Sequence, residues 1–373
     1  MIAALLLGLF IFYLYYHLHH KRQKYPPGPM PLPIVGNLLE VMLNEPGEAA
    51  YAKWNKRYGG LFTFFLGDEP VVMVTDAKKM HEMFVKDADT YSARTIYSQR
   101  YGEYMKLARG GVGGVTFGDG ESWKELRQFA LQTFKHLGLG KNLMQEIIFL
   151  DLEETLRKID AEIEGGREVH DLPHRIDLTI TSIICNLCYG TRVDDGNVRE
   201  FEELLRETNR AMSLFAHPAN LFLQRNPHLF KRLPYFSGHL RASSEAITFI
   251  NTFLQRYIHA HEEKLSAIPP EDIVVTDFLA GFIKARATCA PAKRAFYSPD
   301  EFLSLVGDIW FAAVDTSAET IKWAIAHLIH KPELQRRAHE ELDNFIGSNR
   351  LVTLADRPHL PFCVAMANED LSR

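Results

Sequence analysis

One long apolar segment contains small, acidic and hydroxyl side chains that could bind and protonate a polar ligand. The segment follows SPDE at 298–301, a capping box with proline at the first helical position. It continues as FLSLVGDIWFAAVDTSAETIKWAIAHLIH at 302–330 and is apolar on nearly all sides, which predicts a central helix. Within it Asp315 and Thr316 place a carboxyl beside an alcohol, and the small residues Ala312–Ala313 leave room next to them.

Two interpretations of this acid and alcohol remain open. A buried acid costs free energy unless it is paired or used, so Asp315 and Thr316 could bind and protonate a small ligand. Alternatively, Thr316 bonds to a carbonyl oxygen one turn earlier, and Asp315 pairs with a basic neighbour. Asp308 lies in the same helix and raises the same question.

A second group of functional side chains lies in GESWKELR at 120–127. Ser122 and Glu125 have the spacing of a capping box, which predicts that a helix begins at Ser122. Trp123 and Arg127 are then one turn apart on one face, where an indole N–H and a guanidinium can both donate to one carboxylate. The alternative is a surface arginine beside a packed tryptophan.

The N-terminal sequence predicts a membrane anchor followed by a stiff connector. The first sixteen residues carry no charge, and histidines, lysines and an arginine follow them. Neither a basic start nor a small-residue cleavage site is present, so we expect an uncleaved anchor at 1–18 and not a signal peptide. A basic and proline-rich connector follows at 19–36, and the main domain at 37–373 is expected on the cytosolic side.

Composition and cysteine spacing exclude some classes of function. The net charge of −5 gives no basic footprint for nucleic acid. The Cys185/Cys188 pair has CxxC spacing, but no second pair or suitably spaced histidines follow it. The run around it is apolar and periodic, which favours buried structural thiols.

Periodicity predicts a mainly α protein with a small β-sheet. Short apolar runs at Leu61–Leu66 and Val71–Val74 indicate a hairpin, and Asp76 can cap a helix at Ala77–Val85. The glycine-rich stretch at Arg109–Gly120 lacks the order of a phosphate-binding loop and predicts a mobile loop. Further helices are expected around Ile148–Ile163 and at Arg175–Tyr189, Asn197–Phe215, Ser237–Leu265 and Thr276–Ala287.

The order of these features resembles the microsomal cytochrome P450 family. The order is an apolar anchor, PPGP, a hairpin, G-x-x-W-x-x-x-R and a long helix with AAVDTS; the run at 331–343 and LPF at 360–362 also fit. The resemblance covers the chain as far as Glu369 and implies the cytochrome P450 fold.

The resemblance also implies a role for each matching residue. Trp123 and Arg127 fall on positions that bond a heme propionate. Ala312 and Ala313 fall where the helix passes over the heme, although the family usually has glycine at the second position. Asp315 and Thr316 match the acid and alcohol that relay protons during oxygen activation, which makes them the expected catalytic pair.

The activity implied is a heme-dependent monooxygenase that inserts one oxygen atom of O2 into a lipophilic small molecule. An NADPH-dependent reductase would supply electrons at the endoplasmic reticulum membrane. The glycine-rich loop and the segment at 214–236 would border the substrate cavity.

Two departures limit what the resemblance implies. The family's cysteine loop, which supplies the iron ligand, is absent from this chain, so no metal ligand is assigned. Glu369 is in register with a Glu-x-x-Arg motif, but Arg373 lies four residues after it. We therefore expect a fold incomplete at its C-terminal end and a chain that is inactive alone. The alternative function is a non-catalytic truncated fragment or splice product without the heme thiolate.

Overall fold

The chain forms two compact units, Met1–Ala93 and Arg94–Arg373, which are described separately. The computed structural model describes residues 5, 8, 11–13, 15–44, 47–94, 96, 99, 101–139, 142–347 and 350–372. Half of the predicted anchor at 1–18 lies outside these residues. Within the described ranges, no helix has both the length and the apolar character needed to cross a bilayer.

The smaller unit is built around one antiparallel hairpin. Strand β1 pairs with β2 so that Leu61 faces Val74 and Leu66 faces Glu69. The second strand begins two residues earlier than predicted, because pairing extends to the turn. Its elements are η1 Tyr16–His20, η2 Lys21–Lys24, α2 Leu38–Met42, α3 Glu48–Tyr58, β1 Leu61–Leu66, β2 Glu69–Val74, α4 Ala77–His81, η3 Glu82–Lys86 and α5 Ala88–Tyr91.

The smaller unit has the helix cap that the sequence predicts. The Asp76 carboxylate accepts a hydrogen bond of 3.0 Å from the amide of Lys79 and caps α4. The proline-rich connector lies along β1, where Thr63 N donates to Pro27 O over 3.1 Å. Gly28 allows this approach, because a Cβ there would lie 1.7 Å from Thr63 O.

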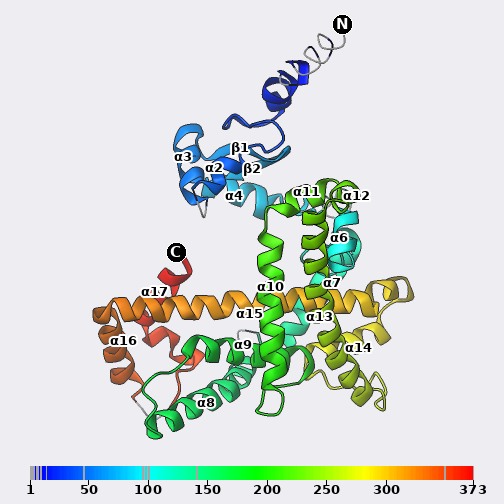
Figure 1. Cartoon of the computed structure of the whole chain (residues 1–373). Coiled ribbons are helices and arrows are strands. Elements are labelled where there is room, and N and C mark those ends of the chain that lie inside the picture. The colour runs from blue at the N-terminus through cyan, green and yellow to red at the C-terminus, as the bar shows by residue number, and fades with distance from the viewer. Residues whose placement is uncertain are drawn as a thin grey trace. The chain divides into compact units, whose positions relative to one another are not determined.

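The larger unit is helical. Figure 1 shows α15 as a long helix across this unit, and α9 and α13 both pack against it. The helices are α6 Gly102–Arg109, α7 Gly120–His136, α8 Asn142–Glu164, α9 Leu172–Tyr189, α10 Val198–Ala216, α11 Ala219–Arg225, α12 Pro227–Phe230, α13 Pro234–Leu265, α14 Phe278–Thr288, η5 Pro291–Tyr297, α15 Pro299–His330, α16 Pro332–Phe345, η6 Leu354–His359 and α17 Pro361–Ser372. The mainly α fold with a small sheet is confirmed.

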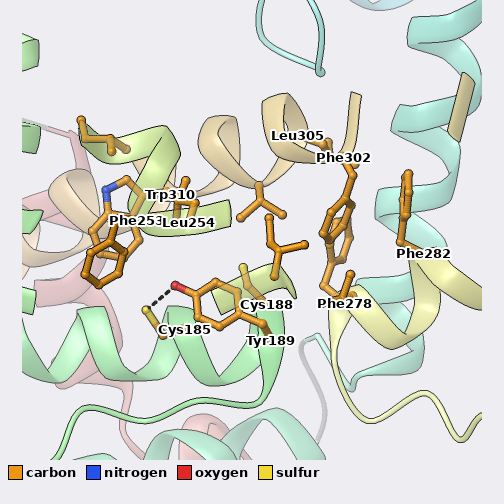
Figure 2. Close-up of a cluster of buried hydrophobic side chains, with 14 of the residues drawn as sticks. Cys185, Cys188, Tyr189, Phe253, Leu254, Phe278, Phe282, Phe302, Leu305 and Trp310 are labelled. Atoms are coloured by element: carbon orange, nitrogen blue, oxygen red, sulfur yellow. Dashed lines mark hydrogen bonds between the residues drawn. The ribbon is translucent and has the colours of Figure 1, made fainter. Parts of the chain in front are cut away.

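Aromatic side chains fill the core between α15 and its neighbours (Figure 2). The Phe302 ring lies 4.3 Å from that of Phe282 and 6.2 Å from that of Phe278, measured between centroids. Trp310 is fully buried and donates its indole N–H to Thr208 Oγ1 over 3.0 Å. The buried rings and this hydrogen bond fix the rotation of α15 about its axis, which decides where its polar residues point.

The predicted start of α7 is wrong. The helix begins at Gly120, with Asp119 as its N-cap residue, and Ser122 already lies inside the first turn. Glu125 does not complete a capping box. Its carboxylate instead accepts hydrogen bonds from Lys293 and from the Tyr297 hydroxyl. Contacts with η5, which is remote in sequence, have therefore replaced the predicted hydrogen bond of Glu125 to the start of its own helix.

Candidate functional site

The acidic, hydroxyl and small residues of the candidate site lie on one unbroken helix, α15. The Ser298 hydroxyl accepts a 3.2 Å hydrogen bond from the amide of Glu301 and caps the helix, as predicted. The helix then continues unbroken to His330. Every side chain from Glu301 to Thr316 consequently has a fixed place on one of its faces.

Asp308 is the buried acid at the centre of this helix. Its Oδ1 accepts from Arg109 Nη2 over 3.0 Å, and its Oδ2 accepts from the amides of Val115 and Thr116 over 2.8 Å each. About two turns earlier, Glu301 accepts from Gly114 N over 3.0 Å. Two acids of α15 therefore bind three consecutive amides of the glycine-rich loop. In this structure the predicted mobile loop is fastened at its middle.

Gly114 allows the loop to approach α15 this closely. Its φ of +83° lies in the left-handed region, and a Cβ there would lie 2.2 Å from Asp308 Oδ2. The loop is also held from its other side, because Trp123 donates its indole N–H to Val115 O over 3.0 Å. We call residues 113–117, held in this way, the clamped loop.

Two opposing effects act on the acidity of Asp308. Burial raises the pKa of this carboxyl above its usual value, while Arg109 and the amides of the clamped loop lower it. Burial is the larger effect, so the pKa remains raised. The ionised form of a carboxyl buried in this way is stable only while all of its hydrogen-bond and ion-pair partners remain in place.

The clamped loop covers one side of an apolar cavity of about 290 Å³. The lining comes from α6, the loop, α10, α13 and α15. The residues are Tyr104, Met105, Ala108, Arg109, Thr116, Phe117, Ala211, Met212, Phe215, Ser243, Ile247, Asp308, Phe311 and Ala312. The glycine-rich loop and Phe215, at the start of the segment 214–236, thus border a cavity as the sequence indicates.

One of the four residues predicted on α15 lines this cavity. Ala312 lines it and is also exposed, while Ala313 and Asp315 are half-buried. The exposed Thr316 donates its hydroxyl to Ala312 O over 2.6 Å, as the alternative interpretation proposed. For the other half of that alternative, no ion pair of Asp315 is found among the described residues.

Trp123 and Arg127 share a helix face as predicted, and they contact each other. The Arg127 guanidinium carbon lies 5.7 Å from the centre of the Trp123 ring. The Trp123 N–H is donated to the clamped loop, whereas Arg127 is exposed and has no carboxylate partner in the described part of the chain. Arg127 is the member of this pair that can meet a further carboxylate without giving up a contact.

Comparison with known proteins identifies the architecture. The family model for cytochrome P450 matches residues 26–371. This chain belongs to the cytochrome P450 family. The match includes the hairpin, the clamped loop and all of α15, and it extends two residues beyond Glu369.

Individual cytochromes P450 give the same result. The chain is 28% identical to mouse (Mus musculus) "Cytochrome P450 2U1" over 92% of its own length and 65% of that protein. It is 27% identical to mouse "Cytochrome P450 2J5", covering 96% of this chain and 68% of the relative. For "Cytochrome P450 2C13, male-specific" of Rattus norvegicus the identity is 27%, with 99% and 72% covered. The chain spans about two thirds of the length of these relatives.

Membership of the cytochrome P450 family implies heme iron as the cofactor, and part of the chain fits it. The exposed face of α15 carries only small side chains at Ala312 and Thr316, which a flat macrocycle can approach. Arg127 offers an exposed cation without a carboxylate partner among the described residues, which suits a propionate. These residues fit the periphery of the group.

Three of the four cysteines, Cys185, Cys188 and Cys363, do not fit the role of iron ligand. Cys185 and Cys188 are buried, and Figure 2 shows the Cys185 thiol bonded to the Tyr189 hydroxyl over 3.0 Å. Burial raises the pKa of Cys185 to about 12 and that of Cys363 to about 11, and it raises the pKa of Cys188 as well. A thiolate ligand needs the opposite shift. The prediction that the CxxC pair is buried is confirmed.

Arg109 and Glu301 are the site residues that the sequence analysis did not identify. Arg109 was assigned only as the edge of a loop, and Glu301 only as a residue of the helix start. The sequence did indicate that Asp308, an acid inside an apolar helix, needs a partner. Its partner Arg109 lies 199 positions earlier, and no local pattern connects the two.

Proposed function

We propose that this chain supplies the substrate cavity and the oxygen-side helix of a heme-dependent monooxygenase that acts on a lipophilic small molecule. The observation that carries the proposal is the position of Ala312. This residue lines the apolar cavity and lies one turn before Thr316 on the face of α15 that fits the heme. A ligand in the cavity would therefore lie beside the site of oxygen chemistry.

Each group of residues has a distinct role in this proposal. The clamped loop and the apolar lining exclude water and orient the substrate. The half-buried Asp315 carboxyl and the Thr316 hydroxyl, which is bonded to Ala312 O, relay protons. Arg127, with Trp123 beside it, would hold a heme propionate, and Ala312 and Ala313 would border the group. When bound, the heme supplies the activation of O2.

The proposed setting follows from the same resemblance. Electrons come from an NADPH-dependent reductase, and O2 is the second substrate. The anchor at 1–18 and the connector at 19–36 attach the domain to the endoplasmic reticulum membrane on its cytosolic side. The named relatives support this setting as members of the same family.

The proton-relay role predicts a large effect of Asp315→Asn on turnover. In the full-length protein with reductase, NADPH and O2, this substitution is expected to slow product formation about a hundredfold, because the amide cannot supply the proton. Affinity for the same substrate, measured by calorimetry, should change less than about twofold because Asp315 does not line the cavity. Asp300→Asn on the same helix is the matched control, since Asp300 is exposed in the first turn. Equal product formation by Asp315→Asn and the control would refute the assignment.

The environment of the cysteines favours a second candidate, a non-catalytic product without a heme thiolate. For the polypeptide of residues 1–373 supplied with heme, we expect no thiolate-type Soret band in the reduced, carbon-monoxide-bound spectrum, because burial favours the protonated thiols of Cys185, Cys188 and Cys363. The relative "Cytochrome P450 2J5" serves as the positive control. A thiolate-type band from 1–373 would mean that one of the four cysteines binds iron, and Cys→Ser variants would identify which.

A further inference from the structure

Two segments of the larger unit carry the same short pattern, an arginine and an alanine followed by a hydroxyl residue. The sequence RAT at Arg286–Thr288 ends α14, and the sequence RAS at Arg241–Ser243 lies inside α13. Protein kinases that select basic sequences bind the cations near the hydroxyl residue through carboxylates of their own. The sequence therefore offers two candidates for phosphorylation, and the fold decides between them.

The last turn of α14 presents its hydroxyl residue to solvent. Arg286 and Thr288 are both exposed, and the Thr288 hydroxyl donates to the carbonyl oxygen of Lys284 over 2.9 Å. The chain beyond the helix is extended, with a φ of −66° and a ψ of 156° at Cys289. Because helix ends fray, only this last turn has to open before the segment can enter the substrate groove of a kinase.

The fold protects Ser243, the hydroxyl residue of the second pattern. Ser243 is 8% exposed, and its hydroxyl donates to His239 O over 3.0 Å. It lies well inside α13, which also contributes Ala246 and Ile250 to the buried core. A kinase could reach Ser243 only by unwinding this helix and exposing that core.

The surroundings of Thr288 are basic, although the chain as a whole is acidic. Residues 278–299 contain two lysines, two arginines and no acidic residue, in a chain of net charge −5. Of these cations, Arg286 and Arg294 are exposed and have no ion pair in the described part of the chain. Their guanidinium groups can meet the carboxylates of a kinase. After the reaction they can offset the charge of a phosphate at the C-terminal end of a helix.

We propose that Thr288 is a phosphorylation site for a protein kinase that selects basic sequences. In the reaction the Thr288 hydroxyl oxygen forms a bond to the γ-phosphorus of a nucleoside triphosphate, while the bond from that phosphorus to the β–γ bridging oxygen breaks. The nucleoside diphosphate leaves, and the hydroxyl proton passes to a base of the kinase. The described lining of the cavity contains no residue of α14, so the proposal stands independently of the proposed function.

The folded chain and two free peptides separate the effect of the sequence from that of the fold. The polypeptide of residues 1–373 and the peptides 283–293 and 238–248 are each incubated with ATP and the catalytic subunit of cyclic-AMP-dependent protein kinase. Both peptides are expected to accept phosphate. In the folded chain, mass spectrometry is expected to find about tenfold more phosphate on Thr288 than on Ser243, because Ser243 is buried.

Arg286→Gln tests whether the kinase reads the charge. Loss of this cation is expected to lower kcat/KM for phosphorylation of Thr288 about tenfold, mainly through KM, the factor for one favourable charge pair across an interface. Arg241→Gln removes the corresponding exposed arginine of the buried pattern and is the matched control, with unchanged phosphate incorporation expected. Thr288→Val keeps the shape of the side chain and should remove the main phosphorylated peptide.

Each outcome bears on the proposal. Absence of phosphate from the folded chain would overturn it, as would equal modification of Ser243 and Thr288, an unchanged rate for Arg286→Gln, or rejection of peptide 283–293 by the kinase. The site is mapped on the unsubstituted chain, whose unfolding curve shows that it is folded. Misfolding of a variant therefore leaves this part of the test intact.

Discussion

Asp308→Ala is expected to lower the free energy of unfolding by about 3–5 kcal/mol, the cost of breaking a buried ion pair from one side. The substitution leaves the Arg109 guanidinium without its partner and removes the acceptor of two loop amides. Urea unfolding followed by circular dichroism measures the loss. The same variant should lose the binding of cavity ligands, because the clamped loop covers one side of the cavity.

Two comparisons separate this effect from the general cost of a substitution. Asp343→Ala removes an exposed acid from α16 and is expected to change stability by less than about 0.5 kcal/mol. Asp308→Asn keeps the shape and one acceptor oxygen, so its cost should lie between the two. If Asp308→Ala is as stable as Asp343→Ala, the clamped loop does not depend on this acid.

Gly114→Ala is expected to destabilise the larger unit by about 3 kcal/mol, combining a left-handed backbone cost with the loss of Asp308 contacts. The added Cβ would lie 2.2 Å from Asp308 Oδ2, a distance at which the loop or the helix must move. Both the thermal midpoint and the affinity for cavity ligands should fall. Unfolding measurements and calorimetry on one preparation give both values.

Gly110→Ala is a matched control for the backbone contribution. Gly110 has a φ of +85°, close to that of Gly114, but a Cβ there would meet no atom within 4 Å. Its substitution should cost about 1–2 kcal/mol, the left-handed backbone cost alone, and leave ligand affinity unchanged. Equal losses for both variants would show that the contact with Asp308 contributes nothing.

Features encoded by neighbouring residues could be predicted from the sequence. The hairpin, the Asp76 cap and the Ser298 cap all depend on residues a few positions apart, and the structure has each of them. The capping box at Ser122 failed although its spacing was correct. Glu125 found stronger partners on η5, and spacing alone does not reveal a competing partner that is remote in sequence.

In the candidate site too, residues on one helix could be predicted, whereas contacts between residues far apart in the sequence could not. Ala312, Asp315 and Thr316 could be assigned because one helix carries them, and their proposed roles remain predictions. The pair of Arg109 and Asp308 could not be predicted, because the two residues are far apart in the sequence and meet only in the folded chain. Sequence revealed a buried acid that needed a partner, but not which of the chain's cations would meet it.

The close approach of Gly114 to Asp308 also constrains how this sequence can diverge. Neither position tolerates a larger side chain while the other keeps its present residue, since a single Cβ at 114 overlaps the carboxylate. A smaller residue at 308 would remove the obstacle at 114, at the expense of the loop's anchor. The two positions are therefore epistatic: the cost of a side chain at 114 depends on which residue occupies 308.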